Sequence, residues 1–275
     1  NGANGQHILI GTTQKQMTKL NAILICVLAF ASISWAQQLL QFDLVGQDTG
    51  TVQILSNDSL VFNYKTGGIQ ASGNAQVIYG DVIVLAGALQ TEFESDEGES
   101  QSVGSFNASG GGEFVMSSTT GVAQSMVSDL VLNRHIFQGP NIEIAMDGLV
   151  VMSDEQVIYD QQSGRLDVSS SAGQGYLLQD DAIIAASRII VIIDADSGES
   201  DSTANFKLEA IGNVLGDFDS VKMSADRLEM AGEGAPVHLI GSVRVDQEGA
   251  TLAGDCISFH QETGVVNLNA SCRFD

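Results

Sequence analysis

The stretch Ile211-Gly-Asn-Val-Leu-Gly-Asp-Phe-Asp-Ser-Val-Lys-Met-Ser-Ala-Asp-Arg-Leu-Glu-Met230 decides the fold. It opens on a Gly-Asn pair and ends on a small-residue step, Ser224-Ala225-Asp226, which is followed by the apolar residues Leu228 and Met230. Apolar residues at every second position indicate a strand that buries one face. The stretch therefore predicts a unit of two strands with a tight bend in the second half.

The closing half of this unit recurs along the chain. Each copy has one apolar anchor, and the anchors are Leu89, Leu130, Val157, Ile189, Leu228 and Ile257. They lie 41, 27, 32, 39 and 29 residues apart, a spacing in the range of stacked β-units. One unit cannot bury its apolar face alone, so we expect neighbouring copies to stack. An antiparallel sandwich without a repeat is the alternative.

A glycine precedes each copy of the closing half. These glycines are Gly73, Gly112, Gly139, Gly175, Gly212 and Gly241. Glycine adopts a positive φ without steric cost. We therefore expect these residues in the turns that reverse one strand into the next.

Composition indicates an all-β protein that does not bind nucleic acid. The chain has 30 glycines and 2 prolines, and no helical periodicity follows residue 45. Its formal net charge of −23 excludes binding of nucleic acid by counterion release, which needs clustered Lys and Arg. An anionic ligand would have to be held by something other than charge.

The N-terminal segment predicts export. Residues 1–16 are interpreted as an upstream or vector-derived leader, and residues 17–36 as a signal peptide. Lys19 supplies its positive charge, the run 20–33 is apolar, and small residues precede the expected cleavage after Ala36. The apolar run is shorter than the roughly 18 residues that span a bilayer. An uncleaved anchor is the alternative.

The remaining chain, residues 37–275, is predicted to be one domain of stacked repeats. Continuous repeats favour a single body, and its length is one that all-β domains commonly reach. If the chain has a seam, we place it near residues 92–112, a stretch rich in Ser, Glu and Gly.

The sequence contains no pattern that argues for catalysis, a cofactor or a metal. No nucleophile elbow, phosphate-binding loop or Cys-x-x-Cys occurs. The acidic loop 194–201 departs from the calcium-loop pattern. His135, His238 and His260 are isolated in the sequence, and we expect them at the surface or at sheet edges. We expect no enzymatic activity.

Two cysteines of the exported chain flank a predicted C-terminal hairpin. They are Cys256 and Cys272, and export would place them where disulfides form. A hairpin centred on Glu262 and Thr263 puts Cys256 opposite Asn269, three residues short of Cys272. A disulfide between them would need a bulge or a longer arc. The sequence does not decide between a disulfide and two free thiols.

The repeat unit resembles that of the OstA/LptA family of periplasmic lipopolysaccharide-transport proteins. The segments that carry the resemblance are Gly73-Asn74-Ala75, Gly212-Asn213-Val214 and Ser224-Ala225-Asp226-Arg227-Leu228. The resemblance covers roughly residues 58–269. It implies an elongated open β-jelly-roll, or β-taco, built from stacked V-shaped antiparallel strands, and a periplasmic location. The chain is longer and far more acidic than the family pattern.

The resemblance also implies a ligand and partners. Lipopolysaccharide would place its lipid A acyl chains in an apolar groove, lined by Val77, Val84, Leu89, Val157, Ile189, Met223, Leu228, Met230, Leu252, Ile257 and Phe259. The first strand, near 39–45, and the last, near 265–274, would dock partners by strand addition. These partners would be an LptC-like inner-membrane protein, an LptD-like outer-membrane protein, or further copies joined head to tail.

Other functions remain open at this point. An exported structural or adhesive β-solenoid would share the repeats but have a filled core and bind no lipid. An LptC-like chain would keep residues 20–35 as an anchor, whereas an LptD-like chain would need a long C-terminal barrel. A carbohydrate-active β-helix enzyme would need a pair of acids, and none is identifiable.

Overall fold

The computed structural model describes residues 38–43, 51–63, 68–94, 102–171, 174–180, 182–193, 206–218, 221–232, 234–247, 249–260, 263 and 265–268. Every regular element in these ranges is a β-strand, and the strands form one antiparallel sheet. The predicted all-β class is therefore confirmed. Within the same ranges, no helix has the length and apolarity needed to cross a membrane.

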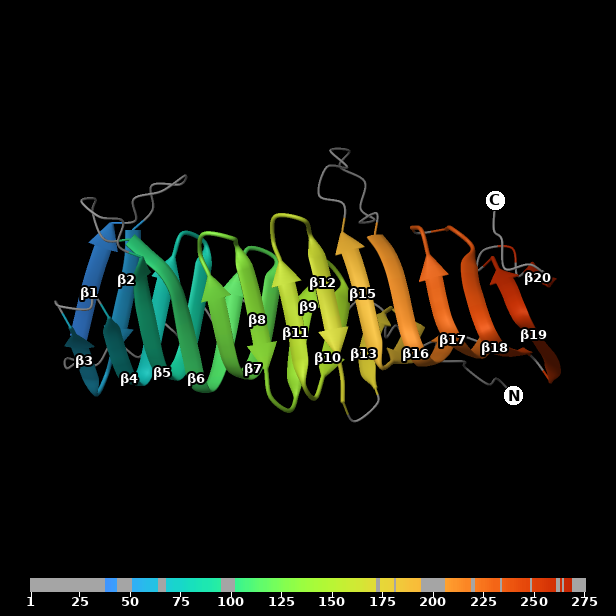
Figure 1. The fold of residues 1–275 in the computed structure, drawn as a ribbon, viewed down its shortest axis with the longest axis horizontal. Coiled ribbons are helices and arrows are strands. Elements are labelled where there is room, and N and C mark those ends of the chain that lie inside the picture. Colours follow the sequence, from blue (N-terminus) through green and yellow to red (C-terminus); the bar gives the residue numbers. More distant parts are fainter. Residues whose placement is uncertain are drawn as a thin grey trace, which may run out of the picture. The chain divides into compact units, whose positions relative to one another are not determined.

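The chain progresses from β1 at one end of the sheet to β20 at the other (Figure 1), although several paired strands, such as β10 with β13 and β12 with β15, are not consecutive. The first ten are β1 (Gln38–Asp43), β2 (Thr51–Ser56), β3 (Ser59–Phe62), β4 (Ile69–Tyr79), β5 (Val82–Glu94), β6 (Ser102–Met116), β7 (Thr119–Asp129), β8 (Arg134–Gln138), β9 (Ile142–Met146) and β10 (Leu149–Ser153). The others are β11 (Gln156–Asp160), β12 (Arg165–Ser169), β13 (Gly175–Gln179), β14 (Ala182–Ala186), β15 (Arg188–Ile193), β16 (Phe206–Phe218), β17 (Val221–Met230), β18 (Val237–Gln247), β19 (Ala250–Phe259) and β20 (Val266–Leu268).

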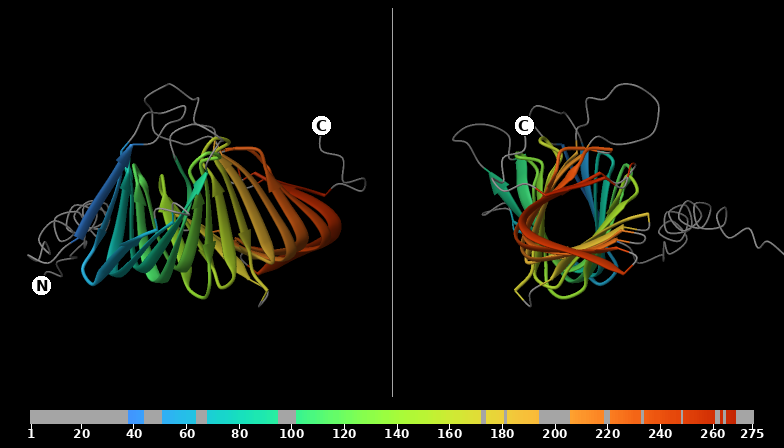
Figure 2. Two further views of the ribbon diagram at one scale, coloured as in Figure 1. Left: turned by 60° about the vertical axis from the view of Figure 1, so that its left-hand side comes forward. Right: turned by 90° about the vertical axis from the view of Figure 1, so that its right-hand side faces the viewer.

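The strand pairings divide the sheet into two arms that meet at a corner. Long strands such as β5 and β17 bend at the corner and belong to both arms, whereas in the middle of the chain separate short strands form each arm. Arm A contains β1, β2, β9, β10, β13, β14 and the corresponding halves of the long strands. Arm B contains β3, β8, β11, β12, β15, β20 and the other halves. Figure 2 shows the bent strands curving around a common axis, as the V-shape predicts.

The six glycines predicted to reverse the strands do not do so, and four of them lie at the corner, so this prediction is wrong. Gly212 and Gly241 have φ of 78° and 74° and lie inside β16 and β18, where the register shifts by a bulge. Gly73 and Gly139 also have positive φ at the corner, whereas Gly112 and Gly175 lie within or at the start of a strand without one. A positive φ suits a bulge as well as a reversal, and the sequence does not distinguish the two.

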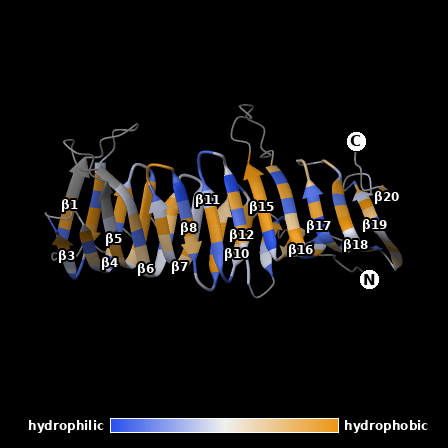
Figure 3. Cartoon of the chain, in the orientation of Figure 1, coloured by the Kyte–Doolittle hydropathy of each residue, from blue (hydrophilic) through white to orange (hydrophobic). Residues whose placement is uncertain are grey.

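The interior between the arms is apolar. Alternate residues along the strands are buried, as in β2 and β18, and Figure 3 shows hydrophobic and hydrophilic segments alternating along the ribbon. The predicted bend at Ser224-Ala225-Asp226 is present as a register shift between Ser224 and Arg227. The period-two alternation in β17 therefore predicted both the strand and the face that it buries.

The outer face of arm A is apolar over the middle of the sheet. One outward row crosses eight paired strands from β4 to β14 without a charged residue: Ile78, Ile83, Val115, Thr120, Ala145, Val150, Leu178 and Ile183. Beside it lie the exposed side chains of Val122, Met152, Tyr176 and Leu215. We call these twelve residues the outer apolar strip. Beyond β14 the same row becomes charged, with Asp217, Lys222 and Asp246.

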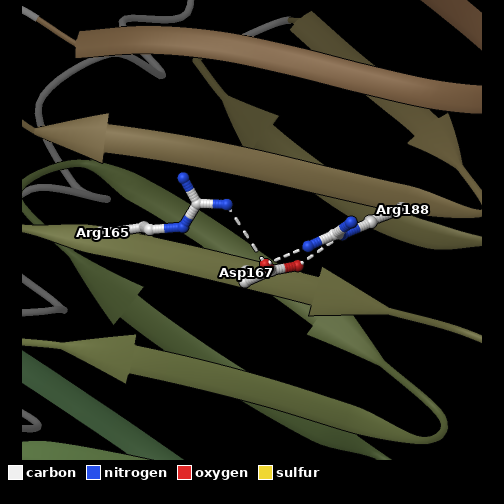
Figure 4. Close-up of polar contacts among 3 residues, drawn as sticks. All are labelled: Arg165, Asp167 and Arg188. Atoms are coloured by element: carbon white, nitrogen blue, oxygen red, sulfur yellow. Dashed lines mark hydrogen bonds and ion pairs between the residues drawn. The ribbon is translucent and has the colours of Figure 1, made fainter.

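The outer face of arm B mixes apolar and charged residues in the same part of the sheet, with Val127, Ile136, Ile158 and Ile190 in one outward row with Asp167 and Glu209. Asp167 on β12 accepts hydrogen bonds from Arg188 on β15, with 2.8 Å between Nε and Oδ1, and from Arg165 at 3.3 Å (Figure 4). These hydrogen bonds, led by the one from Arg188, lower the pKa of Asp167. Arg227 forms ion pairs with Glu209 and Glu229 farther along. The two outer faces therefore differ in chemistry.

Candidate site: the apolar interior between the arms

One inward row of apolar residues and glycines crosses every strand of arm A. We call it row A, and cross-strand partners connect its members in sequence: Leu40, Ile54, Val77, Val84, Phe114, Gly121, Ile144, Val151, Leu177, Ile184, Gly216, Met223, Val245 and Leu252. None of these residues is charged. Gly121 and Gly216 leave space for the side chains of Phe114 and Met223 beside them.

A second inward row crosses arm B in the same way. Row B contains Leu60, Ala71, Leu89, Ala108, Met126, Phe137, Val157, Val168, Ile189, Ala210, Leu228, Leu239, Ile257 and Leu268. Most of its side chains are fully buried, and Leu268 at the end of the row is 60% exposed.

The residues predicted to line a groove all fall on these inward faces. Val77, Val84, Met223 and Leu252 belong to row A, and Leu89, Val157, Ile189, Leu228 and Ile257 belong to row B. Met230 and Phe259 lie two positions farther along their strands on the same inward face and are buried. Whether these residues bind a lipid stays a prediction.

The second copy of the repeat was placed out of register. Five of the six predicted anchors occupy row B, but Leu130 does not, because Met126 is the residue of β7 that pairs into the row between Ala108 and Phe137. Leu130 lies one residue beyond the end of β7 and is also buried. Two apolar residues four positions apart share one face of a strand, so the pattern alone did not choose between them.

An aromatic contact joins the two rows in the middle of the sheet. Phe114 from arm A packs against Phe137 of arm B, with ring centroids 5.2 Å apart in an edge-to-face arrangement. The cavity beside this contact has a volume of only about 10 Å³, close to the minimum for one water molecule. Side chains therefore fill the interior at this point.

His135 is buried in the interior, so its predicted surface position is wrong. Its side chain on β8 is 2% exposed and lies 5.3 Å from the ring of Phe114, between centroids. Nδ1 shares a 2.8 Å hydrogen bond with Ser128 Oγ, and Nε2 has no hydrogen-bond partner among the described residues. Burial lowers the pKa of His135 to about 4, so the ring is neutral at pH 7. Strand pairing places Ser128, seven residues earlier in the chain, and Tyr159 on either side of it.

In the part of the chain that the structure describes, the backbone connects the two arms only at the corner. No strand pairing joins the free ends of arm A to those of arm B; the pairings run within each arm. Side-chain contacts such as that of Phe114 with Phe137 close the interior. Rotation about the corner would leave the pairings within each arm intact but would act on backbone hydrogen bonds at the corner, such as the 2.9 Å bond from Ser187 N to Gly212 O.

Each end of the sheet presents edge strands from both arms. The predicted edges are present, since β1 pairs with β2 and β20 with β19, and neither has a second partner among the described strands. The sequence did not predict two further edges, β3 and the first half of β19. At β3, the amide of Leu60 donates a 3.0 Å hydrogen bond to Gln38 Oε1, which occupies part of that edge.

The C-terminal hairpin has the predicted register. Ile257 lies opposite Leu268 and Phe259 opposite Val266. Cys256 is buried and disulfide-bonded. Cys272 lies outside the described residues, as do the acidic loop 194–201 and the predicted leader and signal peptide, so the pairing of Cys256 with Cys272 stays a prediction. The described residues contain no cluster of metal-ligating side chains.

Comparison with known proteins identifies a family. A family model described as "LptA/(LptD N-terminal domain) LPS transport protein" matches residues 53–265. No curated protein matches the sequence. Among solved structures, LptH from Pseudomonas aeruginosa, described as the LptA homologous periplasmic component of the conserved lipopolysaccharide transport device, has a TM-score of 0.39 and 10% sequence identity, covering 56% of this chain and 92% of that one. The family model spans strands from β2 to β19 and carries the assignment.

Proposed function

We propose a function from one premise: the chain belongs to the LptA/(LptD N-terminal domain) family of lipopolysaccharide-transport proteins. A role in lipopolysaccharide transport follows from this membership. We propose in addition that the protein works in the periplasm and that the space between row A and row B shields the acyl chains of lipopolysaccharide. The sugar-phosphate head of the ligand would stay in solvent.

The single observation that supports this proposal is the continuity of the two inward rows. Each contains 14 residues without a charge, one from each successive strand of its arm. At about 4.8 Å between strands, such a row extends for roughly 60 Å. Hydrocarbon in this space would gain about 25 cal/mol per Å² of apolar surface removed from water. A chain with a net charge of −23 would repel a phosphate group, so apolar burial must provide the affinity.

Ligand entry would require the arms to separate. Side chains fill the interior near Phe114, so an acyl chain would replace the contacts between Phe114 and the ring of Phe137. The hinge would be the corner, where Gly212 and Gly241 already hold the bulged backbone at positive φ. The aromatic contact is therefore the part of the interior that we expect a ligand to displace first.

Photo-crosslinking tests the proposal directly. A photoreactive residue at Leu228, which is 0% exposed and points into the interior, should crosslink to lipopolysaccharide in cells that transport it. The matched control is Arg227, the adjacent residue, whose exposed side chain points outward. Crosslinking at Leu228 and not at Arg227 is the expected result. Equal labelling, or labelling at Arg227 alone, would contradict an interior binding site.

The edge strands provide a proposed means of assembly. We propose that β1 and β20 dock LptC-like and LptD-like proteins, or further copies head to tail, by strand addition. His260 N donates to Val265 O at 3.0 Å, and hydrogen-bonded and non-hydrogen-bonded pairs alternate along an antiparallel ladder. The amides of Val266 and Leu268 therefore face the open edge. Val266→Pro or Leu268→Pro should abolish head-to-tail association and keep the pairing with β19, whereas Asn267→Pro should disrupt that pairing. Unchanged association in both edge variants would refute docking at β20.

A scaffold with a permanently filled core is the second candidate, and the small cavity beside Phe114 favours it. It shares the same strands and edges but predicts no lipid between the arms. Absence of a lipopolysaccharide adduct at Leu228, in a protein that is folded and correctly located, would support this function over lipid shielding.

A further inference from the structure

The outer apolar strip on arm A is an unusual feature for a chain with a formal net charge of −23. It lies on the solvent side of the sheet, opposite row A, and nothing in the described residues covers it. Val122 is 43% exposed and Ile183 is also 43% exposed. Contiguous apolar surface of this kind marks an interaction site in a soluble protein. Row A already supplies the core of this arm, so the strip is not needed for the interior.

We propose that the outer apolar strip binds a second copy of this chain, so that two arms A pack face to face as a symmetric dimer. The contact is separate from the lipid-shielding interior and from the edge strands, and it does not depend on the proposed function. Both kinds of site stay accessible in such a dimer, because the strip lies on the face of the sheet and β1 and β20 lie at its edges.

Charge limits where a second copy could bind, because a net charge far from zero opposes self-association. Two chains of net charge −23 repel each other wherever their charged surfaces meet. The central row of the strip has no charge over eight strands; acidic residues flank it at Glu113 and Glu143 in the row beside it and at Asp81, Asp147 and Asp180 in the turns on the other side. On the outer face of arm B, Asp167 and Glu209 each form an ion pair with an arginine, so a contact between copies there would have to cover these charged pairs.

The size of the strip is sufficient for a dimer. Eight strands at about 4.8 Å spacing give a length of nearly 40 Å, and two outward rows give a width of about 15 Å. Each copy would then bury about 550 Å², or about 1,100 Å² in total, which lies near the lower limit of specific interfaces. Stacked sheets commonly pack with their strands about 30° apart. We therefore expect a dimer that forms reversibly as concentration rises.

Symmetry fixes which residues meet. The contact is isologous, because the same surface is used by both copies, so its two-fold axis passes near the middle of the strip. The middle lies between Thr120 on β7 and Ala145 on β9, which pair with each other. Ala145 of one copy should therefore lie close to Ala145 of the other. A head-to-tail contact through the edges is heterologous and would not bring these residues together.

Two measurements on the purified full chain test the proposal. The mass measured by light scattering should approach twice the monomer mass as concentration increases, and Val150→Lys should return it to the monomer value. The matched control is Ile158→Lys, which places a lysine on the outer face of arm B at an equally half-buried position and should leave the dimer intact. Equal melting temperatures of the two variants would show that neither effect comes from unfolding.

Cysteine crosslinking identifies the surface that is used. Ala145→Cys should give a covalent dimer under mild oxidation, whereas Ile158→Cys should not. The proposal is wrong if the protein stays monomeric, as it would if its own apolar run 20–33 or a different protein covers the strip. It is also wrong if Val150→Lys leaves the dimer unchanged while Val266→Pro abolishes it, because the contact would then be at the edge.

Discussion

The buried histidine of the interior makes the stability of this protein depend on pH. His135 has an ordinary pKa of 6.5 when unfolded and a pKa of about 4 in the folded chain, because burial disfavours the imidazolium. Between these values the unfolded state binds more protons, so the free energy of unfolding falls as pH decreases from 7. The same pKa values give a loss of about 2 kcal/mol between pH 7 and pH 5.

Comparison with a variant isolates this contribution. His135→Leu removes the titrating ring and retains an apolar side chain, and both proteins keep His238, whose pKa burial also lowers. Urea unfolding should be followed at several pH values from 7 to 5, which stays above the isoelectric point of about 4.1 where precipitation would interfere. We expect the wild-type chain to lose about 2 kcal/mol more than His135→Leu over this range.

The result that would refute this reasoning is a parallel pH dependence of the two proteins. Equal slopes would mean that the folded chain accepts a proton on His135 as readily as the unfolded chain does. The ring would then have to be solvated, or paired with an acidic group, at pH 5. Either outcome would contradict the packing of His135 against Phe114 and Tyr159.

Two further predictions concern the corner and the aromatic contact. Gly241→Ala and Gly249→Ala both force alanine into a positive φ, which costs about 1 kcal/mol each. Only the Cβ at position 241 would also collide with a neighbour, the corner residue Asp226 of the preceding strand. Urea unfolding should therefore show a clearly larger loss for Gly241→Ala, and equal losses would argue against a tight corner. Phe114→Ala should lower the free energy of unfolding by about 3–5 kcal/mol and increase binding of a fluorescent hydrophobic probe; unchanged probe binding would mean that the arms do not open.

The sequence predicted the strands of this protein better than their connections. Alternation at Leu228 and Met230 placed both residues correctly on an inward face. Five of the six predicted anchors lie in row B because a strand that buries one face imposes a period of two on its sequence. Gly212 was assigned to a reversal because a positive φ is compatible with either a turn or a bulge. The choice depends on which strands pair, and pairing is a property of the whole sheet.

The surroundings of His135 could not be predicted for the same reason. An isolated histidine is usually exposed or at an edge, and no neighbour in the sequence of His135 indicates burial. Ser128 reaches it through the pairing of β7 with β8, and Tyr159 through the pairing of β8 with β11. A signal was present in the alternation of β8, where His135 shares the inward parity of Phe137. This shared face indicates that His135 is buried only once Phe137 is known to be buried.

The outer apolar strip shows why alternation is an incomplete guide when both faces of a strand are apolar. In β10, Leu149 and Val151 point inward while Val150 and Met152 point outward, so the sequence reads as a continuous apolar run. Such a run is typical of a strand that is covered on both sides. Arm A has the interior on one side and no cover among the described residues on the other. The apolar run of β10 is therefore what we expect if a second copy covers the strip on which Val150 lies.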